Sequence, residues 1–252
     1  MLKKINFLIT MLILFPLMVM TFGGCAPSTP KIEEPVVLPT FDFVPPSTTP
    51  VSSTSVSFCV VSPSFPSEWK ALGYMNHYPY DKFARNMPAD FEEMLTAKGF
   101  RTRGPFRNYD ELTFPDKSET DLILMPKVEI DVRAAGRTTE SINLLGDARY
   151  KWNGTIHLSG RITIALNETL SNERMWNKSV ELPQRQFSYK SPSSAQPVNA
   201  PNINDTKFAN ELAKYMEEYY NLTFDKMWDY LDPNEMTMVK DQAQEIKDKK
   251  RY

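Results

Sequence analysis

The chain has 252 residues, of which 41% are hydrophobic, 24% are charged and 12% are aromatic. This apolar content is sufficient for a folded core, so the composition excludes wholesale disorder, collagen-like repeats and a small disulfide-stapled scaffold. The 29 basic and 31 acidic side chains give a net charge of −2, which is the wrong sign for a dedicated nucleic-acid-binding protein. We therefore expect no nucleic-acid partner.

The first 25 residues have the pattern of a bacterial lipoprotein signal. A basic start precedes an apolar run from Phe7 to Phe22, and two glycines follow before Cys25. The run is shorter than the roughly 20 residues that a membrane-spanning helix needs, which disfavours an uncleaved anchor, and plain secretion would leave Cys25 without a role. We predict that residues 1–24 are a signal peptide and that the Cys25 thiol carries a lipid, which attaches the chain to a membrane.

Residues 25–55 are expected to form a tether. Seven prolines lie between Ala26 and Ser55, among Ser, Thr, Val and Glu residues that show no apolar period, and such a composition favours an extended chain. The stretch Val36–Val44 is more apolar than a spacer requires, so it is expected either to dock on the domain or to act as a partner strand. Residues 56–252 are expected to form a single domain.

Alternating apolar residues in the middle of the chain predict strands. The stretches Leu122–Val132 and Ile156–Leu166 each place apolar side chains on one parity and polar side chains on the other, and Gly160 is expected to mark a bulge. The turn-prone residues Asn167–Asn172 then lead into Met175–Leu182. This order predicts a long antiparallel hairpin.

Helical spacing occurs on both sides of these strands. Apolar residues recur at helical intervals over Phe83–Leu95, where Pro88 is expected either to begin the helix or to kink it. The same spacing recurs over Phe208–Leu231 and in a narrow stripe over Met236–Ile246. We predict an α+β domain with an antiparallel sheet, one face covered by helices, and two C-terminal helices. The narrow stripe is expected to lie on a surface or to pair two copies as a homodimer.

Motifs for catalysis are missing. The two histidines, His77 and His157, lie in no metal-ligand or nucleophile pattern. Cys59 lies in the apolar run Val56–Val61, which predicts a buried strand in which this thiol is a small hydrophobic residue. We expect no enzyme, no catalytic residue, no metal and no cofactor, although a carboxylate pair is not excluded by the pattern. The adjacent acids at 92–93 and 217–218 are expected to be solvated helix faces.

Two segments are candidates for sugar binding. Aromatic side chains gather between Trp69 and Tyr80, where planar rings could hold a sugar, but cover for the edge of the core is the favoured interpretation. The stretch Ala134–Tyr150, expected to be a loop, is flanked or populated by Arg133, Arg137 and Arg149. Arginine forks suit a carboxylate such as that of a sialic acid, although an ordinary charged hairpin loop is favoured. The basic residues 247–251 are expected to be a frayed, solvated helix end.

Several of these pieces occur together in one known family. They are the buried strand leading to Pro63-Ser64-Phe65, the helix ending in Lys98-Gly99-Phe100, the strand over Leu122–Val132, the hairpin from Gly154, and the basic tail to Arg251. In this order the chain resembles the neuraminyllactose-binding haemagglutinin family, the Helicobacter adhesin A type of surface lipoprotein. The resemblance implies an outer-membrane or flagellar-sheath lipoprotein that acts as an adhesin, with sialylated host glycans as ligands.

The resemblance also points to particular residues. The family's suggested sialic-acid motif reads Lys-Arg-Thr-Ile-Gln-Lys, and this chain has Gly136-Arg137-Thr138-Thr139-Glu140-Ser141 at the matching place. Arg137 and Thr138 are thus the candidate glycan-binding residues, while the carboxylate of Glu140 would repel an anionic sugar.

These patterns favour one function and leave one competitor. The favoured function is a non-enzymatic adhesin, lipid-anchored in the outer membrane at the cell surface or the flagellar sheath, which binds a sialylated glycan or a host surface protein. The alternative is a structural lipoprotein of the envelope or flagellar sheath that has no glycan ligand.

Overall fold

The computed structural model describes residues 38–46 and 53–250. The predicted signal peptide, Cys25 and most of the predicted tether therefore lie outside the described residues. The elements run in the order β1 (Ser57–Val61), α2 (Ser67–Ala71), α3 (Tyr80–Ala97), β2 (Arg101–Phe106), α4 (Phe114–Glu119), β3 (Leu122–Ile142), β4 (Ala148–Glu168), β5 (Arg174–Lys190), α5 (Thr206–Tyr230) and α6 (Pro233–Lys250). Short 3₁₀ turns occur at Tyr74–Asn76 and Tyr109–Glu111.

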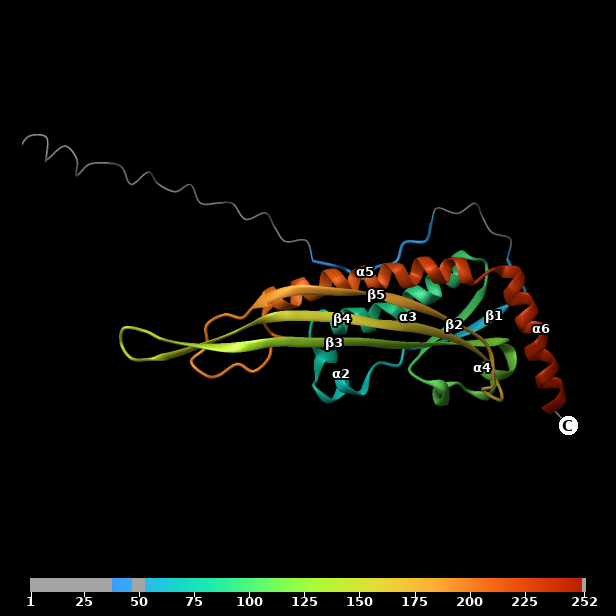
Figure 1. Ribbon diagram of the computed structural model, residues 1–252. Coiled ribbons are helices and arrows are strands. Elements are labelled where there is room, and N and C mark those ends of the chain that lie inside the picture. The colour runs from blue at the N-terminus through green and yellow to red at the C-terminus, as the bar shows by residue number, and fades with distance from the viewer. Residues whose placement is uncertain (1–37, 47–52, 251–252) are drawn as a thin grey trace, which may run out of the picture. The chain divides into compact units, whose positions relative to one another are not determined.

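The five strands form one sheet in the order β2-β1-β3-β4-β5 (Figure 1). The α+β class and the two C-terminal helices are confirmed, and the sheet is mixed: β1 runs parallel to both β2 and β3, and the remaining pairs are antiparallel. All five residues of β1 are buried, as is usual for a parallel strand covered on both faces. The edge strand β2 has no counterpart among the predicted elements.

The antiparallel hairpin predicted through Asn167–Asn172 is confirmed by the pairing of β4 with β5, and β3 and β4 form a second, longer hairpin. β3 and β4 pair without interruption from Leu122 opposite Glu168 to Ile142 opposite Ala148. The expected loop Ala134–Tyr150 is therefore wrong, because most of it continues the two strands and only Asn143–Asp147 forms the turn. Cross-strand hydrogen bonds stabilise this part of the hairpin. Its sequence has no alternating apolar pattern from which the strands could be predicted. β5 pairs with β4 only as far as Lys190 opposite Asn153.

The bulge predicted at Gly160 is confirmed. The β4–β5 register shifts between Leu158 and Gly160, and Gly160 has a φ of +153°. A Cβ atom at this position would lie 2.1 Å from the carbonyl oxygen of Glu129. The neighbouring strand β3 is therefore so close to Gly160 that only glycine fits here.

The helices α3 and α5 cover the face of the sheet on which β3 and β4 place their buried side chains (Figure 1). Helix α3 starts at Tyr80 and contains Pro88 in its interior, so the proline does not begin the helix. Helix α6 contacts β4 and β5 and buries Met236, Val239 and Ala243 within the chain. The homodimer stays a prediction, and these three side chains offer it no free surface.

Residues 38–46 dock on the helical layer, which is one of the two alternatives for this segment. Phe41 is fully buried, with its ring centroid 5.7 Å from that of Phe83 and 5.7 Å from that of Tyr220. The backbone N–H of Phe43 donates to the Asp90 carboxylate over 2.8 Å. The folded unit therefore includes part of the proline-rich segment.

Cys59 lies in a second, smaller cluster with Val61, Leu112 and Ile123, on the opposite face of β1. Its side chain is fully buried, and burial raises the pKa of its thiol. This agrees with the prediction of a small buried hydrophobic residue, since a protonated thiol without access to solvent is a poor nucleophile.

Candidate functional site

The face of β3, β4 and β5 that points away from α3 and α5, here called the outer face, is polar and exposed. Because side chains alternate along each strand and the registers are fixed, residues on this face form rows across the three strands. One row contains Arg133, His157 and Gln186, and all three are exposed. A hollow of about 750 Å³ is lined by these residues and their neighbours.

A second row lies further along the hairpin and contains Arg137, Asn153 and Lys190, here called the polar row. All three side chains are exposed. Between the two rows, Thr155 and Ser188 add hydroxyl groups on the same face. The sequence pattern singled out Arg137, but the strand pairing that brings Asn153 and Lys190 beside it could not be read from residues so distant in the chain.

Charge is distributed unevenly along the outer face. Nearer the base of the hairpin, the Glu129 carboxylate accepts from Lys127 over 2.8 Å and from Arg161 over 2.9 Å, and these hydrogen bonds hold its pKa below the usual range. Arg133 is paired with Asp131. Within the residues that the structure describes, neither Arg137 nor Lys190 has an ion pair, so the polar row carries two uncompensated positive charges.

The structure separates the two residues of the candidate glycan motif. Arg137 and Thr138 are neighbours on one strand, so their side chains point to opposite faces. The Thr138 hydroxyl donates to the carbonyl oxygen of Val198, on the side where Trp152 is buried against Gly136. Arg137 alone reaches the outer face, and Thr138 helps to hold the following loop in place.

The aromatic cluster near Trp69 covers the edge of the core, as favoured from the sequence. Trp69 and Tyr80 are only 3% and 1% exposed, and their ring centroids lie 4.4 Å apart. Tyr74 stacks on Tyr80, and burial raises the pKa of Tyr78 to about 12. Trp69 and Tyr80 are therefore part of the packed core and are not free to hold a sugar.

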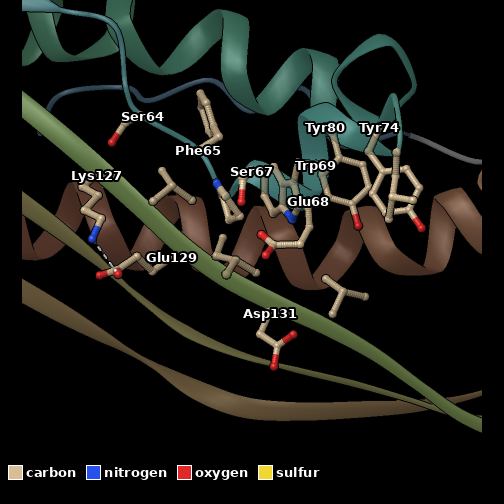
Figure 2. Close-up of a pocket in the computed structure, with 15 residues that line it drawn as sticks. Ser64, Phe65, Ser67, Glu68, Trp69, Tyr74, Tyr80, Lys127, Glu129 and Asp131 are labelled. Carbon is tan, nitrogen blue, oxygen red and sulfur yellow. Dashed lines mark hydrogen bonds and ion pairs between the residues drawn. The ribbon is translucent and has the colours of Figure 1, made fainter.

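A groove of about 640 Å³ lies between this cluster and β3 (Figure 2). Three carboxylates line it, those of Glu68, Glu129 and Asp131, together with a single lysine, Lys127. The Lys127 ammonium is bound to Glu129. The charge of the groove is therefore unfavourable for an anionic ligand.

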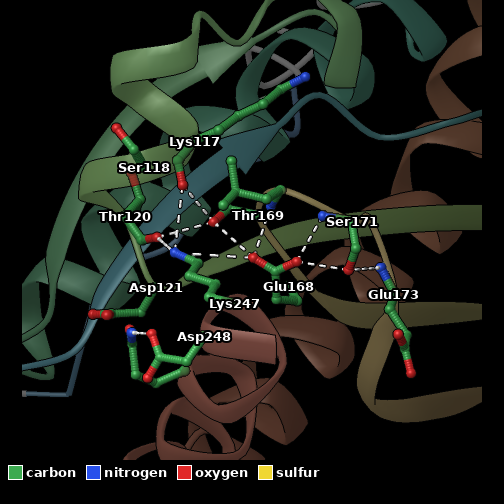
Figure 3. Close-up of polar contacts among 12 residues, drawn as sticks. Lys117, Ser118, Thr120, Asp121, Glu168, Thr169, Ser171, Glu173, Lys247 and Asp248 are labelled. Atoms are coloured by element: carbon green, nitrogen blue, oxygen red, sulfur yellow. Dashed lines mark hydrogen bonds and ion pairs between the residues drawn. The ribbon is translucent and has the colours of Figure 1, made fainter. Parts of the chain in front are cut away.

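A buried polar cluster lies at the base of the hairpin, where β4 ends (Figure 3). Glu168 is fully buried and Lys247 of α6 is 2% exposed. The Lys247 ammonium lies 4.0 Å from the Glu168 carboxylate and donates to the carbonyl oxygen of Thr120. The expectation of a frayed, solvated helix end is thus wrong for Lys247, because α6 folds back onto the end of β4 and buries this side chain.

Most hydrogen bonds to the Glu168 carboxylate come from the turn that directly follows it. Its carboxylate accepts from the backbone N–H groups of Leu170 over 2.7 Å and Ser171 over 2.6 Å, and from the Ser171 hydroxyl over 2.6 Å. Burial raises the pKa of this carboxyl, but these hydrogen bonds outweigh burial and leave the pKa below its usual value. The cluster is closed and fully partnered, which is typical of a structural element.

The part of the chain that the structure describes contains no assembled metal-binding group. No three His, Cys, Asp or Glu side chains there are grouped so that they could hold a metal ion. The acids at 92–93 and 217–218 lie on the helices α3 and α5, where Glu218 pairs with Arg185 of β5. Among residues 38–46 and 53–250, no helix has both the length and the apolar character needed to cross a membrane.

Comparison with known proteins finds a relative in structure and none in sequence. No family model and no curated protein sequence match the chain. A solved structure, the neuraminyllactose-binding hemagglutinin homolog from Helicobacter pylori, superposes with a TM-score of 0.56 and 14% identity, covering 83% of this chain and 100% of that one. The two chains share a fold.

Two further solved structures match less closely. Lipoprotein GNA1162 from Neisseria meningitidis covers 65% of this chain and 96% of its own, at 14% identity and a TM-score of 0.27. Protein XCC0632 from Xanthomonas campestris covers 79% and 95%, at 12% identity and a TM-score of 0.34. Superpositions of this quality are too loose to support an argument, and the shared fold rests on the first match.

Proposed function

We propose that the protein is an outer-membrane lipoprotein, attached through Cys25, whose domain acts as an adhesin and binds an acidic host glycan at the polar row. The observation that carries the proposal is the alignment of Arg137, Asn153 and Lys190 across three strands, with no ion pair among the described residues to neutralise the two cations. Neighbouring positions in such a row lie about 5 Å apart. One sugar residue can therefore contact all three side chains.

The chemistry of the row suits an acidic sugar. A guanidinium binds a carboxylate through two parallel hydrogen bonds, and a lysine adds a second positive charge. The amide of Asn153 can both donate to and accept from sugar hydroxyls. Thr155 and Ser188 extend this hydrogen-bonding surface toward the base of the hairpin. Anionic and hydroxyl groups of one ligand are thus matched on one flat, exposed surface.

The position of Glu140 removes one objection to this ligand. Glu140 has the same strand parity as Thr138, so its side chain points away from the outer face. Its carboxylate accepts from the Tyr150 hydroxyl over 3.4 Å. The carboxylate of Glu140, which stands where the family motif has Gln, therefore does not face the polar row. The intervening strand weakens its repulsion of an acidic sugar.

The shared fold adds support of a coarser kind. The Helicobacter pylori structure is named for neuraminyllactose binding, and neuraminyllactose is a glycan with a carboxylate. For this chain a sialylated glycan is accordingly the first ligand to test, with a host surface protein as the next.

A glycan array tests the proposal directly. The protein used should begin no later than Leu38, because Phe41 and Phe43 pack into the core. We expect binding to sialylated glycans but not to their neutral counterparts, and a loss of at least about tenfold in Arg137→Ala or Lys190→Ala, the scale of one charge-assisted contact. Lys226→Ala is the matched control, since Lys226 is exposed on α5 and its loss changes the net charge equally.

The competing function is a structural lipoprotein without a glycan ligand. Absence of binding to any glycan, or equal binding by Arg137→Ala and the control, would favour it. Protease treatment of intact cells separates the two further, because an adhesin domain is cut at the surface whereas a domain that faces the periplasm is protected. The anchor is tested independently: Cys25→Ser should release the protein from the membrane fraction and abolish acyl incorporation.

A further inference from the structure

The tip of the β3–β4 hairpin carries the two most exposed large apolar side chains among the described residues. Leu144 is 106% exposed, Leu145 is 88% exposed and Ile142 is 70% exposed. Other large apolar residues with high exposure, such as Leu72 and Phe114, lie singly elsewhere on the domain, as is common in soluble proteins. Three within four residues at the end of a hairpin form a patch.

The turn that presents these side chains satisfies its own backbone. The Asn143 side-chain oxygen accepts from the N–H groups of Leu145 over 3.0 Å and Asp147 over 2.8 Å. The N–H of Asn143 donates to the carbonyl oxygen of Asp147, and that of Gly146 donates to the carbonyl oxygen of Asn143. Gly146 has a φ of +89°, which a residue with a side chain adopts rarely. Most of the N–H groups that would lose water in an apolar medium are already bonded.

Behind the tip, the hairpin carries a small excess of positive charge, since Arg137, Arg149 and Lys151 outnumber the two carboxylates of this region, Glu140 and Asp147. The three cations have no ion pair among the described residues, and the carboxylates are hydrogen-bonded to the neutral side chains of Tyr150 and Asn143. With a rise of about 3.3 Å per residue, Arg149 lies within roughly 15 Å of the leucines along the hairpin. Positively charged side chains therefore lie behind the aliphatic side chains of the tip.

We propose that this tip inserts into the surface of an anionic lipid bilayer, with Leu144 and Leu145 among the acyl chains and Arg149 at the level of the phosphates. Two features favour a lipid over a protein partner. The tip is small and convex, far below the roughly 1,000 Å² that a stable protein interface buries. The exposed apolar side chains of the tip are all aliphatic, and the turn lacks the aromatic side chains that dominate protein hot spots. Aliphatic groups backed by cations suit an anionic membrane surface.

The inference does not depend on glycan binding, and its test uses a different observable. An environment-sensitive fluorophore is attached through Leu145→Cys in the full-length chain, reconstituted in vesicles of phosphatidylcholine with phosphatidylglycerol. We expect blue-shifted emission and quenching by lipid-borne bromine. The same probe at Asn221→Cys, on the exposed side of α5, should stay accessible to iodide in the water. Cys59 is buried, and the labelled parent chain gives the background.

Two variants determine which groups are responsible. Leu144→Ser in the labelled chain should lower the lipid-quenched fraction by about tenfold, the scale expected for one leucine leaving an apolar phase. Arg149→Glu, or vesicles without phosphatidylglycerol, should lower it about fivefold. The proposal is overturned if iodide quenches the tip probe equally with and without vesicles. It is also overturned if the blue shift appears only when a partner protein is added. Both substituted side chains are exposed, so loss of folding does not confuse the outcome.

Discussion

The two ends of the β3–β4 hairpin consist of the same pair of strands and have opposite environments. At the base, β4 ends in Glu168, which is fully buried beneath α6 together with Lys247 (Figure 3). At the tip, the turn exposes Leu144 and Leu145 and is followed by arginines that have no ion pair among the described residues. Charged groups are thus inside at one end, and aliphatic groups are outside at the other.

The opposite environments of the two ends indicate that the base contributes to stability and that the tip contributes to binding. A buried ion pair costs desolvation energy and is retained when every polar atom finds a partner, as the hydrogen bonds to Glu168 provide. Exposed leucines and unpaired arginines add nothing to folding and are available to a ligand or a membrane. The base is therefore expected to respond to mutation through stability, and the tip through binding.

The largest effect is expected at Lys247. Lys247→Ala removes the cation beside Glu168 and leaves a buried carboxylate and the carbonyl oxygen of Thr120 without it, so we expect a loss of about 3–5 kcal/mol in the free energy of unfolding. Urea denaturation measures this loss. Lys249→Ala, on the exposed side of the same helix, should change it by less than about 0.5 kcal/mol. Equal values for the two variants would show that α6 does not depend on the buried pair.

The next effect is on the pH dependence of stability. In the fold, hydrogen bonds hold the pKa of Glu168 below its ordinary value of 4.5, so its ionised form stabilises the protein above that value. The contribution is lost as the pH falls through the folded pKa. Stability should therefore fall more steeply below about pH 4.5 in the wild type than in Glu168→Gln.

The comparison with Glu168→Gln also removes the contribution of Asp90, which changes stability with pH in the opposite direction. Burial raises the pKa of Asp90, even though the Tyr220 hydroxyl and the Phe43 N–H donate to it, so protonation of Asp90 favours the fold as the pH falls. Both proteins contain Asp90, and its contribution cancels in the difference between them. Parallel pH profiles, measured by thermal unfolding, would contradict the role given to Glu168.

The sequence predicted the elements whose burial follows a simple period. The stripes over Phe83–Leu95 and Phe208–Leu231 became α3 and α5, and the alternation over Leu122–Val132 and Ile156–Leu166 became the buried half of the hairpin. In each of these elements one face contacts the core and the other contacts water. Apolar residues therefore recur in the sequence with the period of the helix or strand.

Elements that are stabilised by contacts with distant parts of the chain show no apolar period in the sequence. β2 is a largely exposed edge strand, Arg-Thr-Arg-Gly-Pro-Phe, held by parallel pairing with β1. The outer half of the hairpin relies on its ladder of hydrogen bonds, which does not require apolar side chains. Lys247 resembled the other charges of α6 because only the tertiary fold brings it to Glu168.

The candidate site was predictable in part for the same reason. Arg137 was identified through a family resemblance, and the structure adds Asn153 and Lys190 through the strand register. Thr138 was identified with it because a linear motif does not distinguish the two faces of a strand. Predicting the face required knowing that Ala134–Tyr150 is strand rather than loop.

A smaller stability effect is expected at the junction of α6 with β5. The indole N–H of Trp176 donates to the Glu235 carboxylate over 2.7 Å, and a hydrogen bond of this kind to a partly exposed charged group contributes about 1–2 kcal/mol. Glu235→Ala should lower the free energy of unfolding by this amount, whereas Asp241→Ala, exposed on the same helix, should not. A loss below about 0.5 kcal/mol would mean that the apolar stripe of α6 is sufficient to hold it.

The smallest stability effect is expected at the tip. Leu144→Ser combined with Leu145→Ser should change the free energy of unfolding by less than about 0.5 kcal/mol, because both side chains are already in water. Leu158→Ala in the same hairpin, where the side chain is buried, should cost about 2–5 kcal/mol. A loss above about 1 kcal/mol at the tip would mean that the leucines are covered in solution, and the membrane-inserting role would then lack the exposed surface it requires.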